Sequence, residues 1–88
     1  MVKSIFTKEY SLFLSRLRSV RKRSGLTQEQ LAERLNLTQS IISKCERGER
    51  RIDVIELRAF CIALEISLPE FIQQIELDIQ QAEQEMDI

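Results

Sequence analysis

The sequence predicts a compact all-α fold of five helices with an extended C-terminal helix, and three observations support this prediction. The 88 residues contain only two glycines and one proline, so few positions interrupt a helix. Apolar residues recur at spacings of three and four, which is the period of one helical face. Helix-start signals stand at TQEQ, DVIE and SLPE, where a capping residue precedes Glu or Gln by three positions. A chain of this length forms one domain with a modest core.

The first three helices are bounded by capping and helix-ending residues. They are predicted over residues 8–24, 28–35 and 39–47. Thr27 and Thr38 cap the second and third helices, because a threonine oxygen accepts a free N–H of the first turn. Gly25 ends the first helix and Asn36 the second, because these residue types adopt positive φ at the least cost.

The last two helices each open with a capping box. They are predicted over residues 54–64 and from residue 68 to the C-terminus. Asp53 with Glu56 opens the first of them, and Ser67 with Glu70 opens the second. The apolar faces of the first four helices form the predicted core, which consists of Tyr10, Phe13, Leu14, Leu17, Val20, Leu31, Ala32, Leu35, Ile42, Cys45, Val54, Leu57, Phe60, Cys61 and Leu64.

Charge is divided unevenly along the chain. The net charge is −1, but residues 1–51 hold twelve Lys or Arg against five Asp or Glu, a net of +7. Residues 52–88 hold one Arg against nine Asp or Glu, a net of −8. A basic first half indicates a polyanionic partner such as nucleic acid, and the acidic half should then lie away from that partner. A dipolar protein without such a partner is the simpler alternative.

Several classes of function lack the residues that they need. The chain has no histidine and only two cysteines, which excludes His-based catalysis and the usual zinc sites. It shows no nucleophile–base pair and no glycine-rich phosphate loop, so we expect no enzyme, no cofactor and no metal. Cys45 and Cys61 fall in helical patterns and are expected as buried free thiols in the cytoplasm. The longest apolar run, residues 59–64, is far below the roughly 20 residues that span a bilayer.

The second and third helices are predicted to form a helix-turn-helix arrangement. Only Asn36 and Leu37 separate the second helix from the Thr38 cap, and so short a turn makes the two helices cross steeply. Ala32 suits this crossing because its small side chain allows a close approach. The third helix then projects from the body, where it can enter a groove of nucleic acid.

This motif resembles that of a known family. It is the string LTQEQLAERLNLTQSIISKCERGER, with R-x-x-R-K before it and LRAFCIAL after it. The string is similar to the Cro/phage-repressor-type (XRE family) helix-turn-helix DNA-binding proteins over residues 13–72. The resemblance implies a lambda-repressor-like DNA-binding domain in residues 1–72, with residues 73–88 as its acidic helical extension, and double-stranded DNA as partner. Asn36 and Glu65 depart from the family pattern, since each stands where glycine is common.

The third helix divides into two faces at about 100° per residue. Ile42, Cys45 and Glu46 share the inward face. The residues expected to read DNA bases lie outward, at the edge of that face or at the helix start: Gln39, Ser40, Ile41, Ser43 and Lys44. A glutamine can bind adenine through two hydrogen bonds, and an isoleucine can meet a thymine methyl group. The alternative for Ile41 is partial burial against the second helix, and Lys44 suits guanine and phosphate equally.

A second group of residues is expected on the DNA backbone. It consists of Gln28, Thr38, Arg47, Arg50 and Arg51. The arginines follow the third helix and supply positive charge beside it, although solubility alone could explain any one of them. By the family resemblance, Gln28 contacts a phosphate and helps to orient Gln39, and Arg21 forms a structural ion pair with the inward-facing Glu46. Losing one partner of a buried pair costs about 3–5 kcal/mol.

Two apolar stripes remain outside the predicted core. One lies on the outer side of the fourth helix, and the last helix carries a heptad seam made of Leu68, Ile72, Ile75, Ile79, Ala82 and Met86. From the two stripes we expect a homodimer interface formed by Ile55, Ala59, Ile62, Ile72, Ile75 and Ile79. The alternative is that the last helix covers the fourth helix within one chain.

The heptad seam is flanked by acidic residues, namely Glu76, Asp78, Glu83 and Glu85. Like charges make a simple homodimeric coiled coil unfavourable. We therefore expect the seam to pack on a basic neighbour, such as the first helix of the same or of a partner subunit. A second, basic protein at this acidic helix is another possibility, and a frayed end beyond residue 80 is the alternative without any partner.

These features together predict a sequence-specific DNA-binding transcriptional regulator. We expect a cytoplasmic homodimer that reads a palindromic operator as a repressor or autoregulator. The alternative is a protein–protein adaptor, or an antitoxin-like protein that also binds a partner through its acidic C-terminal helix. The basic residues 47–51 and the pair of Gln28 with Gln39 favour DNA binding.

Overall fold

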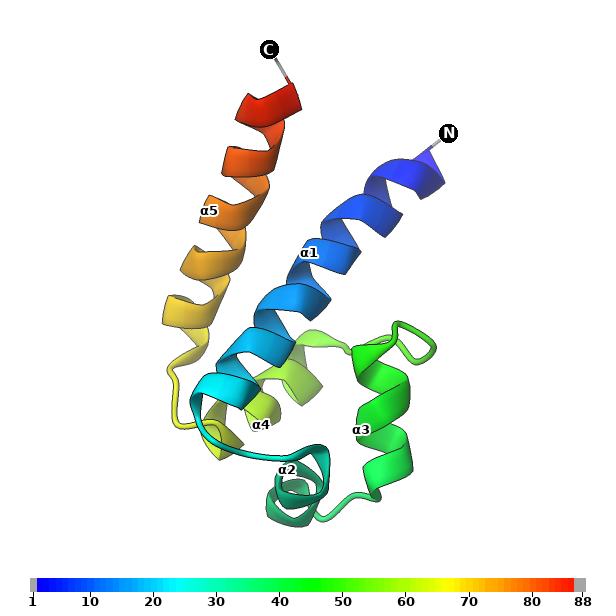
Figure 1. The fold of residues 1–88 in the computed structure, drawn as a ribbon, viewed down its shortest axis with the longest axis vertical. Helices are drawn as coiled ribbons and strands as arrows, with labels where there is room; N and C mark the ends of the chain where they lie inside the picture. The colour runs from blue at the N-terminus through cyan, green and yellow to red at the C-terminus, as the bar shows by residue number, and fades with distance from the viewer. Residues whose placement is uncertain (1, 87–88) are drawn as a thin grey trace.

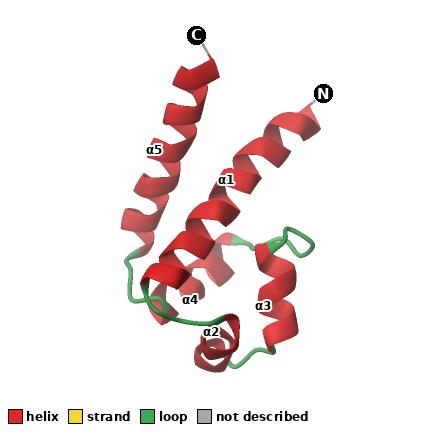
Figure 2. Ribbon diagram, in the orientation of Figure 1, coloured by secondary structure: helices red, strands yellow, loops and turns green. Residues whose placement is uncertain are grey.

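The chain forms five α-helices, and the described residues contain no strand (Figure 1, Figure 2). The helices are α1 Val2–Arg23, α2 Gln28–Leu35, α3 Gln39–Glu46, α4 Val54–Ala63 and α5 Leu68–Met86. This computed structural model describes residues 2–86, and the side chains of residues 8–85. The all-α prediction is confirmed.

The helices are arranged so that the two ends of the molecule differ. α1 and α5 run antiparallel side by side, and both termini lie at the same end (Figure 1). α2 and α3 lie at the other end, and α4 packs on both α2 and α5. The principal axes measure 43 × 25 × 21 Å. The acidic α5 therefore leads away from α2 and α3, as the division of charge predicted.

Reciprocal caps start two of the helices as expected. The Thr27 hydroxyl accepts the Gln30 N–H at 3.1 Å, and the Gln30 side chain accepts the Thr27 N–H at 2.9 Å. Asp53 and Glu56 form the same pair of bonds at the start of α4. These caps use N–H groups that a helix start otherwise leaves without a partner, so they set where α2 and α4 begin.

The start of α1 differs from the prediction. The helix begins at Val2, whereas the sequence pattern predicted a start after Thr7. Residues 2–7 include neither glycine nor proline, so nothing in them breaks the helical hydrogen bonds. A threonine caps a helix only where the preceding chain leaves the helical path, and here the helix continues through it.

The core forms where all five helices meet. Its buried members are Leu17, Val20, Leu31, Ala32, Ile42, Cys45, Leu57, Phe60, Cys61, Leu64 and Phe71. Phe71 of α5 is fully buried and meets the ring of Phe13 edge-on at 6.1 Å between centroids. Both cysteines are buried free thiols, as expected, and burial raises the pKa of Cys61 to about 11.

Two details of the predicted core were wrong. Val54 is 61% exposed, because it is the first residue of α4 and its side chain points back past the helix start. The predicted heptad seam also omitted Phe71, the α5 residue that enters the core most deeply. Within that seam, Ile75 packs on the core and Ile72 is 44% exposed. Met86 lies outside the residues whose side chains are described.

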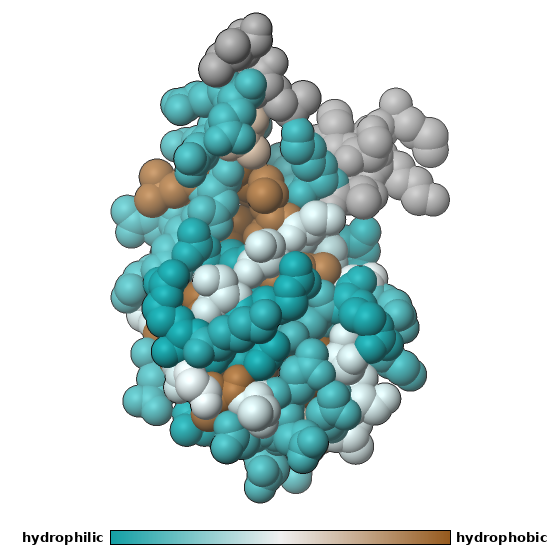
Figure 3. Space-filling model, in the orientation of Figure 1, coloured by the Kyte–Doolittle hydropathy of each residue, from teal (hydrophilic) through white to brown (hydrophobic). Residues whose placement is uncertain are grey.

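An ion pair joins α5 to α1. Arg16 donates to both carboxylate oxygens of Asp78, at 2.8 and 2.7 Å, and both side chains are about one quarter exposed. α1 is thus the basic neighbour that the acidic seam was expected to need. Hydrophobic residues gather between these two helices on an otherwise mostly hydrophilic face (Figure 3).

Two helices end at non-glycine residues with positive φ. Asn36 follows α2 with φ 56°, and Glu65 follows α4 with φ 60°. Each turn is closed by backbone bonds, among them Leu37 N–H to the Ala32 carbonyl at 2.9 Å and Ile66 N–H to the Cys61 carbonyl at 3.0 Å. The departures from the family pattern at Asn36 and Glu65 therefore preserve the left-handed turn, at the steric cost that a Cβ atom brings.

We predict that Glu65→Gly increases the free energy of unfolding by about 0.5–1 kcal/mol, because relief of left-handed strain exceeds the extra entropy of glycine in the unfolded chain. The Arg34 contact that Glu65 makes is exposed and adds little. Urea unfolding measures the change. Asn36→Gly is the matched control and should gain less, since Asn tolerates this conformation. A loss of stability in Glu65→Gly would contradict the prediction.

We also predict a pH-dependent contribution from the pair of Arg16 with Asp78. The hydrogen bond from Arg16 holds the pKa of the Asp78 carboxyl below its usual value, so the stabilisation is present above about pH 4 and lost as the pH falls through the lowered pKa. Asp78→Asn should lower the free energy of unfolding at neutral pH by about 1 kcal/mol. In urea titrations, the difference from the unmodified chain should shrink as the pH falls through the lowered pKa of Asp78.

The control for this measurement is Glu83→Gln, an exposed acidic position on the same helix. It removes one negative charge from α5 without touching the pair. An Asp78→Asn difference that stays constant across the acid range, or that Glu83→Gln reproduces, would show that the ion pair is not its source.

Candidate nucleic-acid interface

α3 presents one face to the core and another to solvent. Ile42 and Cys45 are fully buried and Glu46 is 2% exposed. Gln39, Ser40 and Lys44 are exposed, whereas Ser43 and Ile41 are half-buried. Ile41 packs against the core, which agrees with the burial that the sequence left open as its alternative.

The α2–α3 turn sets how α3 leaves the body of the domain. The turn bends at Asn36, and Thr38 caps α3 by accepting the Ile41 N–H at 3.3 Å. Ala32 is 3% exposed where α2 meets its neighbours, which is consistent with a small residue at the crossing. α2 packs closely on α3, so the exposed face of α3 is held at the end of the molecule opposite the termini (Figure 1).

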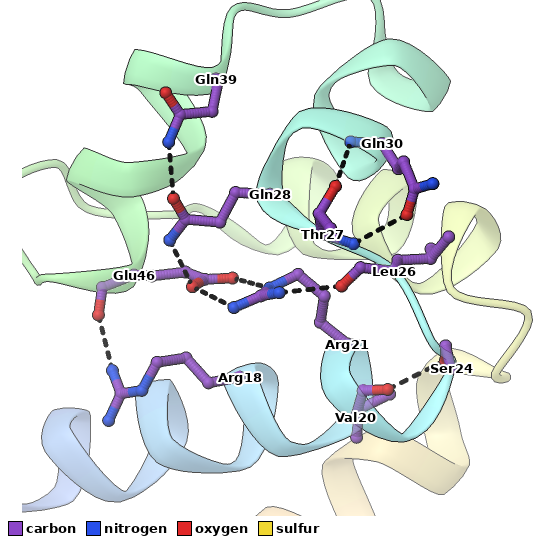
Figure 4. Close-up of polar contacts among 10 residues, drawn as sticks. All are labelled: Arg18, Val20, Arg21, Ser24, Leu26, Thr27, Gln28, Gln30, Gln39 and Glu46. Atoms are coloured by element: carbon purple, nitrogen blue, oxygen red, sulfur yellow. Dashed lines mark hydrogen bonds and ion pairs between the residues drawn. The ribbon is translucent and has the colours of Figure 1, made fainter.

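A chain of polar contacts runs from the core to the exposed start of α3 (Figure 4). Glu46 accepts two bonds from Arg21, Nε to Oε2 at 2.6 Å and Nη2 to Oε1 at 3.0 Å. The Gln28 amide donates to the same Glu46 Oε1 at 2.9 Å. The Gln28 Oε1 then accepts from the Gln39 amide at 2.7 Å.

The pair of Arg21 with Glu46 lies inside the domain. Arg21 is 7% exposed, and its Nη1 also donates to the Leu26 carbonyl at 2.8 Å. One guanidinium on α1 therefore holds both the loop before α2 and the end of α3. Two buried charges of opposite sign stabilise the fold only while both are present, because either one alone would be desolvated without a partner.

Arg18, for which no role was predicted from the sequence, also contacts Glu46. Its Nη1 donates to the backbone carbonyl of Glu46 at 2.7 Å, where the negative end of the α3 dipole lies. With Gln28 and Arg47 it lines a hollow between α1 and α3. The R-x-x-R-K string contains both Arg18 and Arg21, so their spacing of three, which places them on one face of α1, was the available signal.

The three arginines after α3 are engaged within the chain. Arg47 contacts Ser43 and pairs with Glu49 at 2.8 Å, and this pairing raises the pKa of Arg47 and lowers that of Glu49. Arg50 pairs with Glu56 at 2.6 Å, which raises the pKa of the arginine.

Arg51 contacts an aromatic ring. Its guanidinium carbon stands 4.6 Å from the centroid of the Tyr10 ring on α1. A DNA phosphate that binds Arg47 or Arg50 would compete with a carboxylate for the guanidinium.

The residues expected at a dimer interface do not all share one environment. On α4, Ile55 is 73% exposed and Ile62 is 61% exposed, with Ala59 exposed between them. On α5, Ile75 and Ile79 are half-buried and face a groove that Tyr10 and Phe13 of α1 also line. The stripe on α4 is uncovered, whereas α1 partly covers the one on α5. The exposed residues of the expected interface are Ile55, Ala59, Ile62 and Ile72.

Other kinds of site find no support among the described residues. The described side chains of His, Cys, Asp and Glu form no group of three that could hold a metal ion. None of the described helices combines the length and apolar character needed to cross a membrane.

A family model described as helix-turn-helix matches residues 17–71, which contain the turn, the polar chain and the α4 stripe. The chain belongs to the XRE-type helix-turn-helix family. The family assignment places it among DNA-binding transcription regulators, which are generally not enzymes. No curated protein matches the chain.

Three solved structures share the fold of this chain. An XRE-family like protein from Pseudomonas syringae pv. tomato str. DC3000 is 37% identical, with a TM-score of 0.80 over 85% of this chain and 92% of that chain. The wild-type restriction-modification controller protein C.Esp1396I is 29% identical, with a TM-score of 0.76 over 83% and 95%. The clp gene regulator ClgR from Corynebacterium glutamicum is 28% identical, with a TM-score of 0.73 over 88% and 83%.

We predict that the buried ion pair behaves as a unit in unfolding experiments. Glu46→Leu and Arg21→Met should each lower the free energy of unfolding by about 3–5 kcal/mol, because each leaves one buried charge unpaired. The double variant should lose much less than the sum of the two single losses. Urea unfolding of all four proteins gives the coupling free energy, and additive losses would contradict the prediction.

Proposed function

We propose that this helix-turn-helix protein is a sequence-specific transcriptional regulator that binds a palindromic operator as a homodimer, with α3 in the major groove. One observation carries the proposal. Gln39 lies at the exposed start of α3, and its hydrogen bond to Gln28 gives its amide a defined orientation. A side chain oriented in this way suits the reading of a base edge.

Affinity in this proposal comes mainly from phosphate contacts. The residues proposed for them are Gln28, Thr38, Arg47, Arg50 and Arg51. Release of counterions from the neutralised phosphates supplies the free energy, so affinity falls steeply as salt rises. Because Glu49 and Glu56 already neutralise two of the arginines, the exchange of carboxylate for phosphate reduces the net gain at each position.

Discrimination in this proposal comes from α3. Gln39, Ser40 and Lys44 are exposed and can approach base edges, and each good bidentate base contact contributes about 1–3 kcal/mol of discrimination. Ser43 is partly engaged by Arg47, and Ile41 can offer only its uncovered side to a thymine methyl group. We therefore rank Gln39 first among the base-reading residues.

The uncovered stripe on α4 is the proposed centre of the dimer. Ile55, Ala59 and Ile62 place an apolar face in solvent, and burying it against the same face of a second copy forms a two-fold contact. Ile72 of α5, which is 44% exposed, is proposed to add to this interface. Recognition helices paired by a two-fold axis read half-sites about 34 Å apart, which requires a palindromic operator. Repression of the protein's own or other genes follows if that operator overlaps a promoter.

A second candidate function is the binding of a protein partner through α5. Leu77 is 57% exposed on this acidic helix, and Glu76 and Gln80 lie exposed near it. An exposed apolar residue with an acidic and an amide side chain near it suits a basic amphipathic surface. This candidate adds to DNA binding if both hold, and it replaces DNA binding if the chain selects no sequence.

We predict that the protein selects a palindrome from a randomised pool of double-stranded DNA, read by sequencing of the bound fraction. Gln39→Ala should blur one position in each half-site and lower affinity for the selected sequence by about tenfold to a hundredfold, since a bidentate contact is lost. Gln73→Ala, an exposed glutamine on α5, is the matched control and should change nothing. Absence of any enriched sequence at moderate salt would favour the protein-partner candidate.

We predict that charge on the α4 stripe prevents dimerisation. Ile55→Lys with Ile62→Lys should convert the dimer to a monomer in sedimentation equilibrium, because a lysine buried in an apolar interface is strongly disfavoured. Affinity for a full palindrome should fall to that for a half-site. Leu77→Lys is the control, because it changes a similarly exposed apolar residue outside the stripe. A dimer that survives the double change but not Leu77→Lys would place the interface on α5.

A further inference from the structure

We infer that Glu46, beyond its ion pair with Arg21, is a positioning residue that sets which base Gln39 can read. This inference rests on the proposed function. The contacts that carry it are the two amide bonds between Glu46, Gln28 and Gln39 (Figure 4). They form a relay in which each member determines the orientation of the next.

The relay starts from the chemistry of the carboxylate. An ionised carboxylate can only accept hydrogen bonds, and the Glu46 oxygens take them from Arg21 and Gln28. Gln28 must therefore turn its NH2 group towards Glu46, because its own carbonyl oxygen would meet another acceptor there. The Gln28 Oε1 is consequently directed outward, at 2.7 Å from the Gln39 Nε2.

The orientation of the Gln39 amide is determined in the same way. Gln39 must present its NH2 group to the Gln28 oxygen, which uses one of the two N–H bonds. One N–H donor and the Oε1 acceptor of Gln39 remain for a ligand. Adenine offers one acceptor, N7, and one donor, the N6 amine, on its major-groove edge, whereas guanine offers two acceptors, N7 and O6. The relay therefore matches Gln39 to adenine.

Reversal of the relay gives the opposite match. A donor at position 46 would attract the Gln28 oxygen and turn the Gln28 NH2 group outward. Gln39 would then accept that bond with its oxygen and keep both N–H donors for a ligand. Two donors match guanine. Base preference at this position thus depends on a buried residue that does not itself reach the exposed face of α3.

The test exchanges the polarity while keeping the ion pair. In the double variant Arg21→Glu with Glu46→Arg, opposite charges still face each other, but position 46 can only donate. Affinity is measured for four operators that differ only at the base pair read by Gln39. The original chain should prefer adenine over guanine by about tenfold to a hundredfold. The swapped pair should lose this preference or reverse it.

Glu46→Gln provides a second route, in case the swapped pair does not fold. An amide at this position can either donate to or accept from Gln28, so the relay takes both orientations. The ratio of affinities for adenine and guanine should fall several-fold. Gln28→Met is the companion variant: it keeps the ion pair of Arg21 with Glu46 but cuts the relay, and should also lower the ratio.

Modified bases and the free protein supply independent readouts. With 7-deazaadenine, which lacks N7, and purine, which lacks the N6 amine, the original chain should lose affinity while Gln28→Met should be less sensitive. In the free protein, hydrogen exchange at the Gln39 side-chain amide should be slow in the original chain and faster in Gln28→Met, where its acceptor is gone.

The outcomes separate this inference from the proposed function. If Glu46 served only the ion pair, Glu46→Gln would lower stability and weaken all four operators equally, with the adenine-to-guanine ratio unchanged. That result overturns the inference and leaves the proposed function standing. If the original chain shows no base preference at any position, the proposed function fails and the inference fails with it.

Discussion

The buried ion pair of Glu46 with Arg21 is the interaction on which the position of α3, and so the exposed polar surface, depends. α3 has only eight residues, too few to be a stable helix in water by itself. Its position must therefore come from packing and from tertiary hydrogen bonds. Arg21 ties its end to α1 and to the loop before α2, while Ile42 and Cys45 fasten its inner face to the core. The exposed face then has one orientation relative to the domain.

This arrangement combines stability with presentation of a polar surface. A buried ion pair contributes little net stability compared with apolar residues of the same volume, because both charges must leave water. Its value in this fold lies in specificity of geometry. Arg18 and Arg21 both donate hydrogen bonds to Glu46 in the last turn of α3. Gln28 donates to the Glu46 carboxylate and accepts a hydrogen bond from Gln39. A polar connection from core to surface would be lost if apolar residues replaced the pair.

Electrostatics organise the molecule on a larger scale. The basic half of the chain builds α1 to α3 and the acidic half builds α4 and α5, and the fold carries the end of α5 to the far side from α3 (Figure 1). Asp78 of α5 pairs with Arg16 of α1, so the charge of this arginine is neutralised within the chain. Glu49 and Glu56 likewise pair with arginines beside α3. These pairs reduce the positive potential of the surface, so non-specific attraction to phosphate is weaker than the formal charge of residues 1–51 suggests.

The sequence by itself determined the five helices and their limits apart from the start of α1, because those depend on local physics. Capping at Thr27, Thr38 and Asp53 and the left-handed turn at Asn36 use hydrogen bonds and sterics within a few residues. Helical periodicity likewise separated the buried side of α3 from its exposed side.

Only the tertiary structure decided which residues of different helices meet. No local pattern shows that Phe71 enters the core or that Arg16 of α1 pairs with Asp78 of α5. The orientation of the Gln39 amide depends on a carboxylate seven residues further along α3, through a glutamine of α2. Such long-range contacts arise only when the helices pack, because packing alone brings distant side chains within hydrogen-bonding distance.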